Sequence, residues 1–327
     1  MPSLKEIKGH ISSVRSTLKI TSAMKLVASA KLHKAQLAIG NMLPYAHRLN
    51  GMLVKLMESP DSAAAGPAPA PEMHVPADDL ITPREIRRVA IVAFSSNASL
   101  CGGFNTTVIR EVSAVLQEYR SGGLPDTAIT VYSVGRKMAD AMRKLGFPNP
   151  PADADGQTPA DFAKLSESPN YEGAAALAGE LLDGYRSGRF DRIELVYNHY
   201  RSTASQPTVR QTYLPLSPGE ESLSPATGKG AEVRKEQMPH APNPEDYIIE
   251  PDRTRVVKAL LPKVIRLRIY TALLDSAAAE HAARTVAMQT ATDNGQDLLE
   301  ELTLAYNKSR QQKITNEILD LVSGSLT

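Results

Sequence analysis

The stretch IKGHISSVRSTLKITSAMKLVASAKLHKAQ, residues 7–36, begins a run in which an apolar residue recurs every three or four positions. The run continues to Leu56 and covers fifteen positions, of which thirteen are apolar. This 3.5-residue period predicts a left-handed coiled coil, and we expect an N-terminal coiled-coil helix over residues 1–58. Pro44 falls inside the pattern and predicts a kink or a joint. The fifteen positions are Ile7, Ile11, Val14, Leu18, Thr21, Lys25, Ala28, Leu32, Ala35, Ile39, Met42, Ala46, Leu49, Leu53 and Leu56.

The segment TSAMKLVASA, residues 21–30, contains both polar exceptions, Thr21 and Lys25, and carries only one charge. Its outer positions include Met24, Val27 and Ala30. A two-stranded coiled coil in water needs charged residues on its outer positions, so this segment is not suited to exposure. Packing in the core of its own domain is one explanation, but no other helical segment is long enough to surround it. We therefore expect other subunits to cover it.

The central residues, 87–216, alternate predicted strands with predicted helices. VAIVAF at 89–94 and the segments 128–135 and 191–200 are typical of buried strands, and residues 206–216 suggest an edge strand. Helical patterns cover residues 106–120, 136–145 and 171–188. This alternation predicts βαβ units, and hence a Rossmann-like α/β domain with a mostly parallel sheet.

Two segments rich in proline flank this domain. Residues 59–86 are expected to form a Pro/Ala-rich linker, and residues 217–246 a Pro/Ser-rich insertion or linker. Helical signals then dominate residues 247–327, where Pro262 near the start suits the first turn of a helix. One helix over 263–323 would span roughly 90 Å, far more than a compact domain. Two long terminal helices predict an antiparallel pair with the α/β domain at its base.

Composition excludes several classes of function. A net charge of +1 offers no electrostatic basis for binding nucleic acid. The single cysteine, Cys101, indicates a reducing compartment, and no apolar run reaches the length of a membrane span. The seven histidines are scattered without a metal-binding spacing, so no metal or cofactor is expected. The start of the chain resembles no secretory signal, which favours a cytoplasmic location in a prokaryote.

The segment SLCGGFN, residues 99–105, lies between a predicted strand and a predicted helix, where phosphates often bind. It lacks both the G-x-G-x-x-G and the G-K-[ST] patterns, so a tight strand-to-helix turn is the favoured interpretation. No general base is identifiable for Cys101, and no catalytic constellation is present. An α/β nucleotide-binding protein and a coiled-coil tether that dimerises through residues 7–56 remain as alternatives to a shaft without catalysis of its own.

Three of these segments together resemble the γ subunit family of F-type ATP synthases, the central stalk of the F1 sector. Residues 7–36 are similar to that family's opening helix, SLCGGFN to its central signature, and residues 270–324 to its C-terminal signature. Two departures are visible: the Asp-Arg-Gly that usually precedes Leu-Cys is absent, and Gln289 stands where Lys or Arg is common.

The resemblance implies a non-catalytic rotor shaft, present once per complex, inserted into a ring of three α and three β subunits. The α/β domain would contact the ε subunit and the c-ring. Proton-driven rotation of the asymmetric shaft would then change the conformation of each β catalytic site in turn. The complex would lie on the cytoplasmic side of the bacterial inner membrane, with this chain as a peripheral component that has no membrane span.

The resemblance also implies candidate contact residues, all on the two terminal helices. Arg284 and Arg310 suit carboxylate partners, because a guanidinium binds them bidentately, although pairs with Glu280 or Glu317 of the same chain are the alternative. The heptad position of Lys25 places it on the predicted contact line between the two helices. The resemblance instead places it on the surface that faces a β subunit, and both positions stay open. The candidates are Met24, Lys25, Arg284, Arg310, Gln311, Thr315 and Glu317.

Overall fold

A computed structural model describes residues 3–58, 78–150, 162–216, 249–250 and 252–324. The chain divides into two compact units. The helix-pair unit consists of Met1–Ala30 and Arg284–Thr327, and the α/β unit consists of Lys31–Ala283. Both chain ends therefore belong to one unit, although they are far apart in sequence.

Helix α1 spans Leu4–Glu58. It begins with a capping box, in which the Ser3 amide donates to Glu6 Oε2 at 2.8 Å and the Glu6 amide donates to Ser3 Oγ at 3.3 Å. All fifteen heptad positions are buried or half-buried, which confirms the predicted period. No joint occurs at Pro44, because the helix continues through it. A proline removes one backbone hydrogen bond, and buried neighbours such as Ala46 and Leu49 hold the helix on both sides of that loss.

Helix α8 spans Arg253–Gly324. Asp252 caps its start, since its side chain accepts from the Arg255 amide at 2.8 Å. The expectation that Pro262 lies in the first turn is therefore wrong: the helix begins earlier and Pro262 lies inside it. Buried side chains on both sides of the proline, including Leu261 and Val264, pack in the core and compensate for the missing hydrogen bond.

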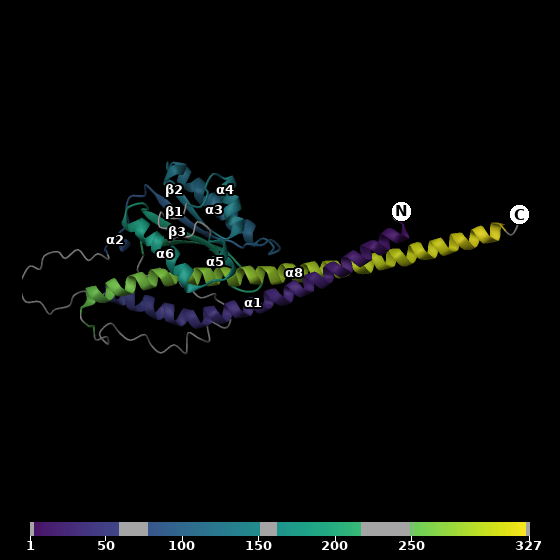
Figure 1. Cartoon of the computed structure of the whole chain (residues 1–327), viewed down its shortest axis with the longest axis horizontal. Helices are drawn as coiled ribbons and strands as arrows, with labels where there is room; N and C mark the ends of the chain where they lie inside the picture. Colours follow the sequence, from purple (N-terminus) through teal and green to yellow (C-terminus); the bar gives the residue numbers. More distant parts are fainter. Residues whose placement is uncertain (1–2, 59–77, 151–161, 217–248, 251, 325–327) are drawn as a thin grey trace, which may run out of the picture. The chain divides into compact units, whose positions relative to one another are not determined.

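The α/β unit contains a four-stranded sheet with the order β2-β1-β3-β4. Strand β1 lies between β2 and β3 (Figure 1) and pairs in parallel with both, whereas β4 pairs antiparallel with β3 at the edge. This confirms the predicted α/β class and its mostly parallel sheet. The strands are β1 Val89–Phe94, β2 Ile129–Val134, β3 Arg192–Asn198 and β4 Thr208–Leu214.

Strand β1 is buried on both faces, and its alternate residues belong to two different cores. Val89, Ile91 and Ala93 pack in the core with α3 and α4. The intervening residues pack in the core that contains α6 and the buried residues of α1 and α8 from this unit. A central parallel strand is covered on both sides, which explains its uninterrupted apolar sequence. The helices are α2 Asp78–Ile81, α3 Phe104–Ser121, α4 Arg136–Lys144, α5 Ala163–Glu167 and α6 Tyr171–Arg186, and a 3₁₀ turn spans Asp126–Ala128.

The two proline-rich segments fall largely outside the described residues. Of the expected linker at 59–86, residues 59–77 are not described, and the segment that follows contains α2. Leu80 of α2 is buried, and its carbonyl accepts from the Leu216 amide at 2.8 Å. The expected insertion at 217–246 lies wholly outside the described residues.

Candidate functional site

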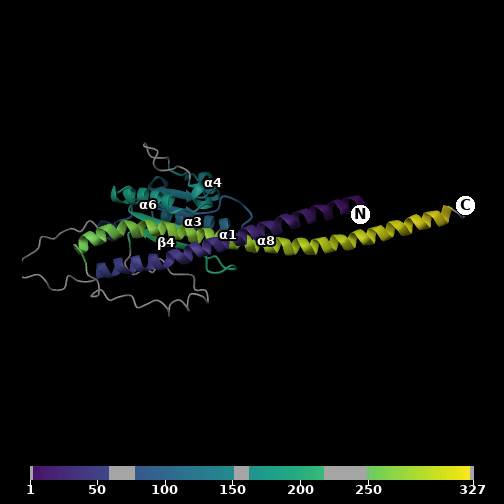
Figure 2. The ribbon, with the colours of Figure 1, turned by 60° about the horizontal axis from the view of Figure 1, so that its bottom comes forward.

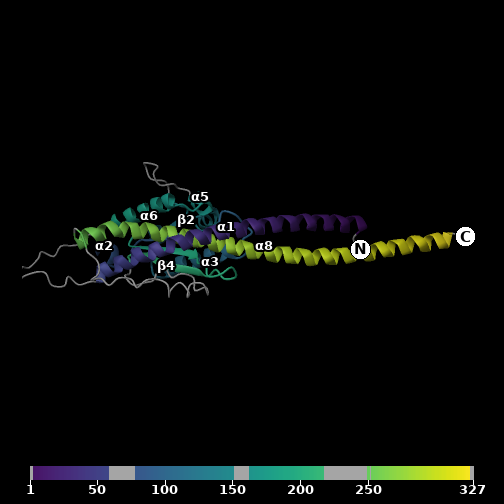
Figure 3. The same ribbon diagram turned by 90° about the horizontal axis from the view of Figure 1, so that it is seen from below.

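All seven candidate contact residues lie in the helix-pair unit, where α1 and α8 lie side by side and antiparallel (Figures 2 and 3). We call the contact line between these two helix segments the seam. Along it, α1 residue numbers rise while α8 numbers fall. The three pairs that define it are Leu18 with Gly295, Thr21 with Thr292, and Lys25 with Gln289.

Gly295 allows the two helices to approach closely at one end of the seam. A Cβ atom at this position would lie 2.8 Å from Leu18 Cδ2. The leucine therefore packs directly on the α8 backbone, and a larger residue at 295 would have to displace it. A glycine costs roughly 1 kcal/mol in a helix interior, which this close packing offsets.

Thr21 and Lys25, the two polar exceptions in the heptad pattern of α1, each pair with a polar residue of α8. The Thr292 hydroxyl donates to the Thr21 hydroxyl at 2.9 Å. The Lys25 amino group donates to Gln289 Oε1 at 2.6 Å, and Gln289 Nε2 donates to Asp293 Oδ1 at 2.7 Å. Lys25 thus lies on the seam, half-buried, with its charge directed toward the Asp293 carboxylate through an intervening amide. Of the two positions left open for Lys25, the structure has the seam.

The outer surface of this unit is rich in exposed apolar side chains. Leu26 is 68% exposed and Val27 is 58% exposed, next to the half-buried Met24. Ile20 on α1 and Val286 on α8 are exposed as well. The predicted apolar exterior of residues 21–30 is therefore confirmed. Apolar surface of this extent is typical of a region that another protein covers.

Helix α8 continues beyond the start of α1 (Figures 1 to 3). Ile314, Ile318 and Leu321 in this extension follow an i, i+4, i+7 spacing, which places them on one helix face. All three are exposed, and Leu321 reaches 74%. Leu304 and Leu319 of the same helix are exposed as well. The extension is thus an amphipathic helix whose apolar side has no covering helix among the residues that the structure describes.

The polar candidates on α8 differ in how they are held. Glu317 pairs with Lys313 at 3.6 Å, and among the described residues it has no ion pair with Arg310. The Thr315 hydroxyl donates to the Gln311 carbonyl of its own helix at 2.9 Å. Arg310 is exposed and has no hydrogen bond or ion pair within the described part of the chain. Arg284 is half-buried and already engaged in an interaction within the chain.

The alternative nucleotide site would need helix N-termini in the α/β unit that are open to a phosphate. At α4, the first three amides, residues 136–138, donate to Asn97 Oδ1, the Ser96 carbonyl and Ser95 Oγ, at 2.9, 3.2 and 2.9 Å. These protein groups take the place that an anion would occupy. Residues 95–97, which directly follow β1, therefore cap the N-terminus of α4.

The SLCGGFN turn before α3 is also bonded internally. Asn105 Nδ2 donates to Cys101 Sγ at 3.2 Å, and Asn105 Oδ1 accepts from the Ser96 amide at 3.0 Å. Cys101 is only 2% exposed and packs with Phe104 against Ala279 of α8. These contacts favour the tight-turn interpretation and give Cys101 a packing role.

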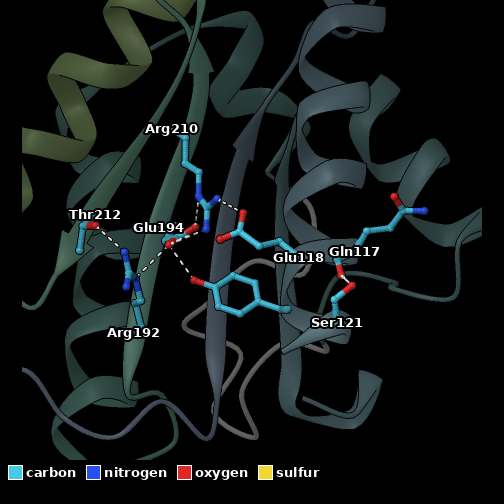
Figure 4. Close-up of polar contacts among 8 residues, drawn as sticks. Gln117, Glu118, Ser121, Arg192, Glu194, Arg210 and Thr212 are labelled. Atoms are coloured by element: carbon cyan, nitrogen blue, oxygen red, sulfur yellow. Dashed lines mark hydrogen bonds and ion pairs between the residues drawn. The ribbon is translucent and has the colours of Figure 1, made fainter. Parts of the chain in front are cut away.

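A group of charged side chains surrounds Glu194 on β3 in the α/β unit (Figure 4). This carboxylate is 1% exposed and accepts from the Tyr119 hydroxyl at 2.7 Å and from Arg210 Nε at 2.7 Å. Arg192 Nε lies 2.9 Å from it, and Arg210 also reaches Glu118. Burial and the hydrogen bond to Glu194 raise the pKa of Tyr119, so its hydroxyl stays protonated and donates. The charges balance, and the cluster joins α3, β3 and β4.

The described parts of the chain contain no cluster of residues that fits a metal ion. In those parts, no helix has both the length and the apolar character that crossing a membrane requires. Sequence reasoning missed Thr292, Asp293 and the role of Gln289, since partners on two helices more than 260 residues apart require their axial register.

Comparisons with known proteins agree on one family. A family model described as ATP synthase matches residues 3–326. The ATP synthase gamma chain of Phocaeicola vulgatus is 50% identical over 326 residues and is matched over 100% of both chains. The ATP synthase gamma chain of Bacteroides thetaiotaomicron is 45% identical with the same coverage.

Two solved structures have the same fold. One is the central stalk and c-ring of the Tetrahymena thermophila mitochondrial ATP synthase, where a chain matches with a TM-score of 0.52 and 20% identity, covering 83% of this chain and 99% of that one. The other is the OSCP, F1 and c-ring part of the Euglena gracilis mitochondrial ATP synthase, with a TM-score of 0.57, 18% identity, and coverage of 99% and 93%.

Proposed function

This chain belongs to the ATP synthase gamma chain family, and we propose that it is the shaft that turns inside a ring of three α and three β subunits. One copy of the chain serves each complex. The shaft performs no catalysis of its own. Its rotation, driven by proton flow, changes the conformation of each β catalytic site in turn. The single observation that carries this proposal is the apolar exterior of the helix-pair unit.

The physical argument starts from the cost of that exterior. Full burial of a Leu or Val side chain contributes about 1.5–3 kcal/mol. Several such side chains of this unit are between 41% and 74% exposed and forgo part of that contribution. A free helix pair with this surface would associate with other proteins. A surrounding ring removes the apolar side chains from water. It also leaves few directed bonds between shaft and ring, so no single rotational position is strongly trapped.

The seam supplies the second requirement, because a shaft must transmit torque without its helices sliding past each other. Thr21–Thr292 and Lys25–Gln289 are directional contacts that are satisfied in one axial register. The Leu18–Gly295 contact adds a steric stop. Polar pairs inside an apolar seam specify register in this way in other coiled coils.

We assign the contacts to the ring to the exposed residues of the same unit. Met24 would lie against β-subunit loops, and Arg310 would meet a carboxylate, because its guanidinium is exposed and unpaired among the described residues. Gln311, Thr315 and Glu317 lie on the same extension. Arg284 would need to exchange its present interaction for one with a β subunit.

The remaining partners follow from the proposed role. The α/β unit would contact the ε subunit and the c-ring. The complex would sit on the cytoplasmic side of the bacterial inner membrane, with this chain held there through its partners.

The test is assembly. The chain, tagged at residue 1, is expressed together with the α and β subunits of the same genome, and the purified complex is weighed by native mass spectrometry. The expected result is three α, three β and one copy of this chain, with ATP hydrolysis that is lost when the chain is left out. Recovery of the chain without α and β would contradict the proposal.

The coiled-coil tether is distinguished by crosslinking. Cysteines placed at positions 21 and 292 should form a disulfide within one chain, because the Thr21 and Thr292 hydroxyls lie 2.9 Å apart on the seam. Disulfide-linked dimers, in place of the crosslinked monomer, would favour a tether.

A further inference from the structure

The loop that follows β3 contacts both long helices within the α/β unit. His199 Nδ1 lies 2.5 Å from Asp275 Oδ2 on α8, and the Tyr200 amide donates to Asp275 Oδ1 at 2.9 Å. The Tyr200 hydroxyl accepts from Gln36 Nε2 on α1 at 2.7 Å. Two adjacent residues therefore join the end of a central strand to both α1 and α8.

Asp275 is the centre of this contact, because both of its carboxylate oxygens accept hydrogen bonds from the loop. The pair is mostly buried: the side chains of His199 and Asp275 are 22% and 17% exposed. A charge-assisted hydrogen bond in such surroundings is stronger than one between neutral groups. The strength of this connection therefore depends on whether the imidazole carries a proton.

We propose that His199 and Asp275 form a pH-sensitive latch that holds the β3 loop on α8, closed when the imidazole is protonated and weakened when it is neutral. The latch is a connection between the sheet and a long helix, with the carboxylate as its fixed part. Hydrogen exchange of the Tyr200 amide reports whether the latch is closed, because this amide donates to the same carboxylate.

The charges around the imidazole decide the direction of the effect. The hydrogen bond to Asp275 raises the pKa of His199, against a lowering by burial and by Arg201 of the same loop. Tyr197 on β3 also interacts electrostatically with Asp275, and Arg268 of α8 has the opposite electrostatic effect on Tyr197. Burial, first, and then Asp275 raise the pKa of Tyr197, so its hydroxyl remains neutral and does not compete for the charge.

The raised pKa of His199 determines whether the contact gains or loses stability as the pH rises. A histidine whose pKa is higher in the folded than in the unfolded chain stabilises the fold fully below its ordinary value of 6.5. The stabilisation is lost as the pH rises through the raised folded value. The latch is thus tightest at acidic pH and loosens on the alkaline side.

The mechanical consequence rests on the proposed function. If the helices are a shaft and the sheet is where the rotor grips, torque passes through the loop that joins them. Alkaline pH would then make the connection between rotor and shaft more compliant.

The test is hydrogen–deuterium exchange of the assembled complex, or of the full chain, from about pH 6 to about pH 9, with intrinsic exchange rates corrected at each pH. The readout is the peptide that contains the Tyr200 amide. We expect its protection to fall about tenfold across this range, the loss expected for one charge-assisted hydrogen bond. His199→Gln should abolish the pH dependence. Asp275→Asn should abolish it too, while its oxygen can still accept from Tyr200.

The matched control is His33→Gln, since His33 is exposed on α1 in the same unit. This variant should keep the full pH dependence. Constant protection of Tyr200 in the unaltered chain, or an unchanged pH dependence in His199→Gln, would overturn the latch. Failure of the chain to assemble with α and β would instead count against the proposed function, because the exchange can still be read in the full chain alone.

Discussion

Thr21 and Lys25 occupy heptad positions at which the pattern expects apolar side chains. Each finds a polar partner on α8, so neither leaves an unpaired group on the seam. Their polarity is therefore a feature of the pairing between the two helices. A single helix seen in isolation makes the same residues resemble a defect.

The value of the Lys25–Gln289 contact is measurable as a coupling energy. Lys25→Met and Gln289→Leu each remove one partner and should each lower the free energy of local opening of residues 286–293 by about 1 kcal/mol. The double variant should lose less than the sum, with a coupling of about 0.5–1.5 kcal/mol. Native-state hydrogen exchange of the full chain measures all three. A coupling of zero would mean that the contact does not hold the seam.

We expect Arg310 to contact a carboxylate of the surrounding ring. Arg310→Gln should lower ATP-driven turnover of the assembled complex by about fivefold, because it removes about 1 kcal/mol of a charge-assisted contact with the ring. The effect should shrink as salt is added. Lys313→Gln is the matched control on the same helix, since Lys313 is already paired with Glu317. Equal turnover in the two variants would remove Arg310 from the proposed contact set.

At the scale of elements, the sequence predicts most helices and strands from their periodicity. All fifteen heptad positions of α1 and the apolar run of β1 match the structure, because one buried face leaves a clear period in the sequence. The predicted place of Pro262 in a first turn is wrong, since proline suits a first turn but the Asp252 cap and the packed core favour an earlier start. The short helix α2 has no period long enough to detect.

The exposed apolar side chains of α1 control the behaviour of the free chain. Leu26→Gln together with Val27→Gln should increase the soluble fraction of the isolated chain and weaken its assembly with α and β. Sedimentation of the isolated chain and co-purification of the ring measure the two effects. Ser12→Gln with Ser13→Gln, at exposed polar positions of the same helix, should change neither. If the Leu26/Val27 variant assembles normally, the covered surface lies elsewhere.

At the scale of the whole molecule, both units contain part of α1 and part of α8, but the two helices are covered differently in each unit. In the α/β unit, α1 and α8 pack in the core of the domain. In the helix-pair unit, they pack only on each other within the described residues, which leaves apolar side chains exposed. The sequence indicates the charge-poor surface but cannot supply its partners. It also cannot give contacts such as His199–Asp275, because these depend on how the sheet packs on α8.

The central claim is that other subunits enclose the helix-pair unit, and cysteine labelling in the assembled complex tests it most directly. Val27→Cys and, on α3 of the α/β unit, Gln117→Cys replace residues that are both exposed in this chain. The native Cys101 is buried and contributes little background. With a water-soluble thiol reagent, we predict rapid labelling at position 117 and strong protection at position 27. Labelling at position 27 as fast as at position 117 would contradict the enclosed shaft.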